Sequence, residues 1–132
     1  MTPLNIVTSL ELSKRLKELG VEVPSVFWWG KDKEIVFNPL LPNQHVLYHA
    51  YTSEELGRML PRNCPEHELK SLQICHSFGD GWFVGYGDHM NLDGCHVEDG
   101  DSLGDTMAKM LIWLLDRGLI TKEQVNETNS RL

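Results

Sequence analysis

The stretch from Ser102 to Gly118 constrains the fold of this chain more than any other, because it has the pattern of a core helix. Its apolar residues recur at the three- and four-residue spacing that places side chains on one helix face: Leu103, Met107, Met110, Leu111 and Leu114. Ile112, Trp113 and Leu115 widen this face, so we expect neighbours to cover the helix on more than one side. Ser102 can cap its start, and Gly118 suits a left-handed exit.

Three further helices are predicted from capping boxes, in which a Ser or Thr is followed three residues later by Glu or Gln. The boxes are Thr8-Ser9-Leu10-Glu11, Thr52-Ser53-Glu54-Glu55 and Thr121-Lys122-Glu123-Gln124. Gly20 suits the end of the first helix, and Pro61 ends the second because proline cannot continue a helix. The third is short, over residues 122–129.

Runs rich in aromatic and β-branched residues predict the strands. They are Val26 to Trp29 and Glu34 to Phe37, which form a hairpin around Gly30, then His45 to Tyr51, Leu69 to Cys75 and Gly81 to Tyr86. We expect loops over residues 38–43 and 87–101, with a turn over 77–80. The order of helices and strands predicts one α+β domain over residues 1–132, with helices packed on an antiparallel sheet and a long C-terminal core helix.

Charge and composition exclude several classes of partner. The chain has 12 basic and 19 acidic residues and a formal net charge of −7, and its longest basic run is Lys14-Arg15. This argues against a nucleic-acid partner. The longest apolar run, Met110 to Leu115, is far shorter than the roughly 18 residues of a membrane span, so we expect no membrane partner. Cys64, Cys75 and Cys95 cannot all pair as disulfides, which favours a reducing cytoplasm.

Two Cys-His pairs are the sharpest candidates for chemistry. Cys75-His76 and Cys95-His96, with His89, contain the thiolates and imidazoles of a tetrahedral zinc site. The spacing speaks against zinc, because zinc motifs place ligands two to four residues apart and adjacent strand residues point to opposite faces. A small hydrolase with Cys75 or Cys95 as nucleophile and His89 as base is another alternative. We favour buried cysteines and surface histidines, and we expect no cofactor.

The acidic segment before the core helix is the candidate interaction surface. Asp88, Asp93, Glu98 and Asp99 lie there without any Lys or Arg from Asp88 to Asp105. A calcium loop does not fit, because its first and twelfth positions would be His89 and Gly100, where carboxylates are needed. Such a segment can attract a basic protein. The alternative is a solvated loop whose acids complement the helix N-terminus.

An aromatic run, Phe27-Trp28-Trp29, contains two neighbouring tryptophans of one predicted strand. Strand alternation places one of them inward, in the core, and the other outward. The outward ring can cover a neighbouring helix or lie in an interface with a partner.

Several segments together resemble a family of short, uncharacterised phage and prophage proteins. The resemblance rests on Thr8 to Leu12 with Leu16 to Gly20, Ala50 to Leu56 with Leu60-Pro61, Gly81 to Val84, and Leu103 to Leu115. It implies a capped helix at the start and a capped Ala/Leu/Lys-rich helix near the end, but no activity and no catalytic set. We therefore expect a non-catalytic, cytoplasmic protein-interaction or accessory domain whose partner is a basic host or phage protein. A Cys/His metal protein or a small hydrolase is the alternative.

Overall fold

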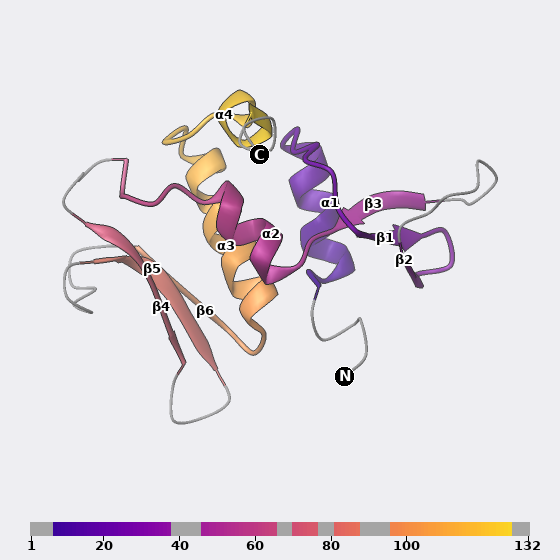
Figure 1. The fold of residues 1–132 in the computed structure, drawn as a ribbon, viewed down its shortest axis with the longest axis horizontal. Helices are drawn as coiled ribbons and strands as arrows, with labels where there is room; N and C mark the ends of the chain where they lie inside the picture. The colour runs from indigo at the N-terminus through magenta and orange to yellow at the C-terminus, as the bar shows by residue number, and fades with distance from the viewer. Residues whose placement is uncertain (1–6, 38–45, 66–69, 77–80, 88–95, 128–132) are drawn as a thin grey trace.

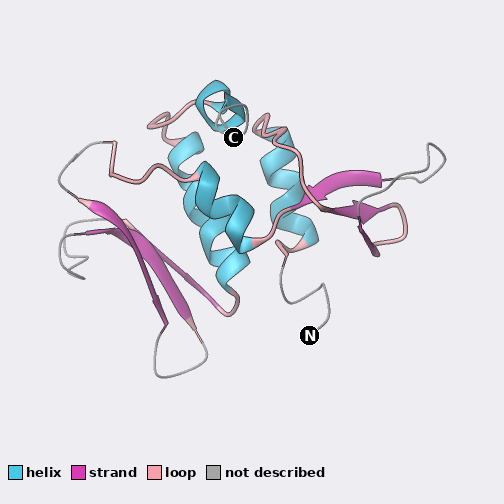
Figure 2. Cartoon of the chain, viewed as in Figure 1, coloured by secondary structure: helices cyan, strands magenta, loops and turns pink. Residues whose placement is uncertain are grey.

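A group of helices lies between two small antiparallel sheets (Figures 1 and 2). The computed structural model describes residues 7–37, 46–65, 70–76, 81–87 and 96–127. The α+β class is confirmed, and the expected antiparallel sheet proves to be two separate three-stranded sheets. The predicted loop over 38–43 and turn over 77–80 lie outside the described residues.

The helices and strands follow the predicted order. The helices are α1 (Leu10–Glu18), α2 (Ser53–Met59), α3 (Leu103–Asp116) and α4 (Lys122–Glu127). The strands are β1 (Phe27–Gly30), β2 (Ile35–Phe37), β3 (Val46–Ala50), β4 (Ser71–His76), β5 (Trp82–Gly87) and β6 (Val97–Gly100). The first sheet has the order β2-β1-β3 and the second has the order β4-β5-β6.

Helix α3 is the centre of the main core, as its pattern predicts. It contacts α1, α2, β5 and β6, and Met110, Leu111 and Leu114 are completely buried. The Ser102 hydroxyl caps the helix by accepting the backbone N–H of Asp105 at 3.1 Å. Gly118 follows the helix with φ of 71°, a left-handed conformation that costs glycine little. Helices and strands therefore cover α3 on more than one side, as its wide apolar face predicts.

Two of the three capping boxes form as predicted, and the first helix begins differently. Both reciprocal hydrogen bonds join Thr52 to Glu55 at the start of α2, and Thr121 to Gln124 at the start of α4. In α1 the N-cap is Ser9 and not Thr8. The buried Thr8 hydroxyl lies 2.7 Å from the hydroxyl of Ser13, and the Thr8 N–H donates to the Tyr51 carbonyl at 2.9 Å, so neither group takes part in the predicted cap.

The first sheet packs on α1 around a second, smaller core. Its hairpin has the predicted position, with β1 antiparallel to both β2 and β3. Trp29 is buried beside Val7 and Ala50, and its indole N–H donates to the Thr8 carbonyl at 3.0 Å. Trp28 projects to the opposite face and contacts the ring of His49, so the predicted division of the two tryptophans is confirmed.

The second sheet packs on α3 through β5, where Val84 and Tyr86 are buried. The prediction of a loop over residues 87–101 is wrong for residues 97–100, which pair with β5 and form the third strand of this sheet, β6. Aspartate and glycine disfavour strands on average, but backbone hydrogen bonds to β5 override this weak local preference. Strand β6 is at the sheet edge, where charged side chains discourage further pairing.

Candidate functional site

The Cys/His residues do not form a common site within the described parts of the chain. Cys75 and His76 are adjacent in β4 and point to opposite faces of the sheet. The His76 ring lies 4.5 Å from that of Trp82, centroid to centroid. His96 stacks on Trp113 at 4.0 Å and bonds to the carboxylate of Glu98. His89 and Cys95 lie outside the described residues.

No three His, Cys, Asp or Glu side chains come close enough to hold a metal ion within the described ranges. The imidazoles of His76 and His96 instead contact tryptophan rings from β5 and α3. The histidine of each Cys-His pair that was considered for zinc therefore makes a separate aromatic contact. The hydrolase alternative stays a prediction, because its base, His89, lies outside the described residues.

The acidic candidates occupy different positions on β6. Glu98 pairs in register with buried Val84, and its carboxylate bonds to His96. Asp99 points to the other sheet face, is exposed, and pairs in register with Phe83. Asp88 and Asp93 lie outside the described residues. Of the two described acids, only Asp99 has the free exposure that an electrostatic docking surface requires.

Two more acids gather where β6 turns into α3. Asp101 and Asp105 line a hollow of about 420 Å³ together with Trp82 and the capping hydroxyl of Ser102. Asp101 is exposed, whereas the Asp105 carboxylate accepts the backbone N–H of Ser9 at 2.7 Å. Asp99 and Asp101 therefore form the exposed part of this acidic edge, and Asp105 has a structural partner.

Among the three described histidines, the imidazole most altered by its surroundings is His49 of β3, which the sequence did not single out. Burial, and secondly the positive charge of Lys17, lower the pKa of His49 from 6.5 to about 4. The Ser25 hydroxyl donates to the Phe27 carbonyl at 2.7 Å and lies 2.7 Å from Nδ1 of His49. Since that hydroxyl has a single proton, Nδ1 of His49 carries the proton of their hydrogen bond. Ser25 is thus not activated as a nucleophile, because activation requires the hydroxyl to donate to the imidazole.

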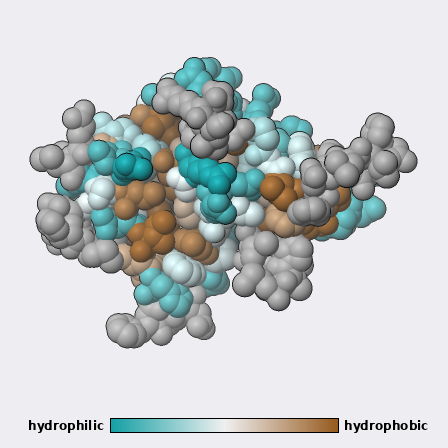
Figure 3. Space-filling model, in the orientation of Figure 1, coloured by the Kyte–Doolittle hydropathy of each residue, from teal (hydrophilic) through white to brown (hydrophobic). Residues whose placement is uncertain are grey.

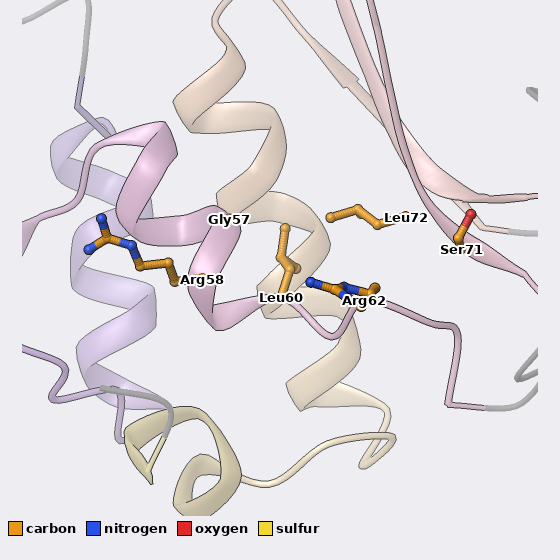
Figure 4. A pocket seen from close by; sticks show the side chains of 6 residues that line it. All are labelled: Gly57, Arg58, Leu60, Arg62, Ser71 and Leu72. Atoms are coloured by element: carbon orange, nitrogen blue, oxygen red, sulfur yellow. The ribbon is translucent and has the colours of Figure 1, made fainter. Parts of the chain in front are cut away.

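A groove between α2 and the start of β4 is lined by positively charged side chains, in contrast to the acidic edge at β6. It encloses about 510 Å³ and is lined by Gly57, Arg58, Leu60, Arg62, Ser71 and Leu72. In Figure 4, Leu60, Arg62 and Leu72 lie close together, while the Arg58 guanidinium extends away along α2. That guanidinium pairs with Glu54 at 2.6 Å. Within the described chain, Arg62 has no ion pair and is exposed, so it is the principal cation of the groove.

Sequence reasoning missed this groove. Its walls come from residues 57–62 and 71–72, which are brought together by the pairing of Leu72 with Arg62. The local signal was weak: two arginines four residues apart on either side of Pro61. Nothing in that spacing indicates which strand lies opposite.

Large hydrophobic side chains remain uncovered on both sheets. Ile74 and Phe83 of the second sheet are 41% and 37% exposed, and Val26 and Leu47, at the first sheet, are 43% exposed each. Figure 3 shows hydrophobic surface over both ends of the visible face. In the second sheet the two side chains lie on opposite faces: Ile74 shares the face of buried Val84, and Phe83 lies on the face away from α3.

Comparison with known proteins identifies no family for the chain. No family model matches it, and neither the curated proteins nor the solved structures contain a significant match. In the described residues, no helix is long and apolar enough to cross a membrane. The function therefore has to be inferred from the surface of the chain itself.

Proposed function

We propose that this chain is a non-catalytic protein-binding domain, an accessory protein of phage or prophage type that works in the cytoplasm. The observation that supports this is the exposed apolar area of the second sheet: Phe83 is 37% exposed on the face away from α3, and Ile74 is 41% exposed on the other face, at the edge strand β4. Covering such side chains removes apolar area from water, which stabilises a complex by roughly 25 cal/mol per Å² before the costs of association.

The charges around this sheet favour a protein partner with charged regions of its own. Asp99 and Asp101 form an exposed acidic edge at β6, and Arg62 lies beside the opposite edge strand, β4. A partner that contacts the face away from α3 would meet the Phe83 ring with Asp99 directly beside it, an apolar contact with charge at its rim, as in many protein interfaces. Basic regions of the partner would be steered to the β6 side.

The test compares two matched double variants of the full chain. Ile74→Thr with Phe83→Thr replaces the exposed apolar side chain on each face of the second sheet, and Val26→Thr with Leu47→Thr replaces those at the first sheet; threonine retains a preference for strands. A host protein captured by the parent chain would be purified and its Kd measured by calorimetry. We expect a Kd at least about tenfold weaker for the first variant and a change of under about threefold for the second.

Two results would overturn the proposal. One is that no host protein forms a stoichiometric complex with the parent. The other is that a purified partner binds the Ile74/Phe83 variant as tightly as the parent, provided that thermal unfolding shows both to be folded.

A further inference from the structure

The outer edge of β4 is only half covered by the chain. The Leu72 N–H donates to the Arg62 carbonyl at 2.8 Å, and the Cys64 N–H donates to the Lys70 carbonyl at 2.7 Å. Asn63 pairs with Ser71 in an antiparallel bridge between these two bonds. Residues 62–64 thus act as a short additional strand beside the beginning of β4.

Beyond Leu72 this edge has backbone groups that no described residue pairs with. Alternate residues of a strand direct their N–H and C=O groups to the same side, so Ile74 and His76 face the same edge as Leu72. No backbone hydrogen bond joins that side of Ile74 or His76 to another described segment. The Ile74 side chain is also 41% exposed. An open edge with an apolar side chain is a template for an added strand.

The groove next to this edge supplies a pocket and a charge. Leu60 and Leu72 give it an apolar wall, and the Arg62 guanidinium lies beside them (Figure 4). A guanidinium can bind a carboxylate through two parallel hydrogen bonds. The local positive charge contrasts with the net charge of −7, which repels acidic molecules elsewhere on the surface of the chain.

We infer that the groove between α2 and β4 binds an extended acidic segment of a partner protein, which adds to the second sheet along the edge at Ile74 and His76. This inference rests on the proposed protein-binding function and names its site and partner chemistry. Backbone hydrogen bonds to β4 hold the segment, an apolar side chain fills the groove over Leu60 and Leu72, and a carboxylate pairs with Arg62. This is recognition by strand addition, with pockets reading alternate side chains.

The experiment uses two short fluorescent peptides, one of alternating valine and glutamate and one of alternating valine and lysine. Binding to the full chain is followed by fluorescence anisotropy. We expect the glutamate peptide to bind and the lysine peptide to bind at least about tenfold more weakly. Arg58→Glu with Arg62→Glu should weaken the binding of the glutamate peptide by about tenfold or more. The control, Lys31→Glu with Lys122→Glu, makes the same change in net charge at exposed positions away from the groove and should have little effect.

Strand addition has a test of its own. Ile74→Pro removes an N–H that faces the open edge and leaves the hydrogen bonds to β5 in place. We expect it to abolish binding, while Ile74→Val should retain at least half of the affinity. If the proline variant does not fold, as judged by circular dichroism, the arginine variant still decides the role of the groove.

Several outcomes would overturn the inference. They are equal binding of both peptides, equal effects of the arginine and lysine variants, or tight binding by a folded Ile74→Pro variant. Analytical sedimentation of the parent without peptide tests whether a second copy of the chain fills the groove. A dimer that is lost in the arginine variant would show this and would overturn the inference. A purified host partner whose Kd is unchanged by the arginine variant would reject this site but leave the proposed function intact.

Discussion

The carboxylate of Asp105, in the first turn of α3, accepts a hydrogen bond of 2.7 Å from the backbone N–H of Ser9, the N-cap of α1. The two residues are 96 positions apart in the chain. Asp105 also donates its own N–H to the cap of α3, Ser102. One side chain therefore joins the starts of two helices, where a negative charge is favoured by both helix dipoles.

Asp105→Ala should destabilise the protein, because it leaves a partly buried N–H without its charged acceptor. We expect a loss of about 1.5–3 kcal/mol in the free energy of unfolding, measured by urea denaturation. Asp105→Asn keeps an acceptor oxygen and should lose less. Glu22→Ala, at an exposed carboxylate, serves as control and should change stability by less than about 0.5 kcal/mol. If Asp105→Ala lost no more stability than Glu22→Ala, the structural role of this hydrogen bond would be contradicted.

Stability should fall in alkali because of the buried Tyr51. Its hydroxyl donates to the Val23 carbonyl at 2.6 Å, and burial, then the charges of Glu55 and Glu22, raise its pKa far above the usual range. Above about pH 10 the unfolded chain loses this proton while the folded chain keeps it, so folding loses up to about 1.4 kcal/mol per pH unit. Urea denaturation between neutral and alkaline pH should show this fall.

Tyr51→Phe separates that titration from general alkaline instability. The variant should be less stable at neutral pH by about 1 kcal/mol, since the Val23 carbonyl loses its donor. It should, however, lose stability less steeply above pH 10 than the parent does. Parallel curves for the two proteins would show that another group causes the alkaline loss.

Stability should also fall in mild acid because of His49. Its pKa is lowered to about 4 in the folded protein, so between pH 6.5 and 4 only the unfolded chain binds this proton. Stability is therefore complete above about pH 6.5 and declines as the pH falls toward 4. Because solvent reaches part of the ring and screens its charge, we expect a loss of about 1–2 kcal/mol and not the full linkage value.

His49→Gln, which keeps a polar group near Ser25, should flatten this part of the pH profile. His76→Gln removes an exposed imidazole and is the matched control. Urea denaturation at several pH values measures both. If the control flattens the profile as much as His49→Gln does, the assignment to His49 is wrong.

The exposed acids at the β6 edge should accelerate binding to a basic partner. Asp99→Asn with Asp101→Asn should lower the association rate with the purified partner at low salt, and the difference should shrink as salt rises and the Debye length falls to about 8 Å. Glu11→Gln with Glu123→Gln makes the same charge change on exposed helix positions. Equal slowing by both variants, measured by stopped-flow fluorescence, would indicate net charge and not a local surface.

Local chemistry in the sequence accounts for much of the fold. The capping box of Thr52 and Glu55 identifies the start of α2, and the spacing of apolar residues identifies α3 as the buried helix. The alternation of Trp28 and Trp29 predicts that one ring is buried and the other is not. These features were predictable because they depend on neighbours within one or two turns, or on the two-residue period of a strand.

Long-range pairing decided what the sequence left open. Residues 97–100 become β6 only because β5 supplies their hydrogen-bond partners, and the Thr8 N–H, which a capping box would use, donates to the distant Tyr51 carbonyl. The groove likewise exists only because the Leu72 N–H meets the Arg62 carbonyl. Caps and periodicity are short-range properties that a sequence displays, whereas a site made from separate segments depends on their relative placement, which tertiary packing alone determines.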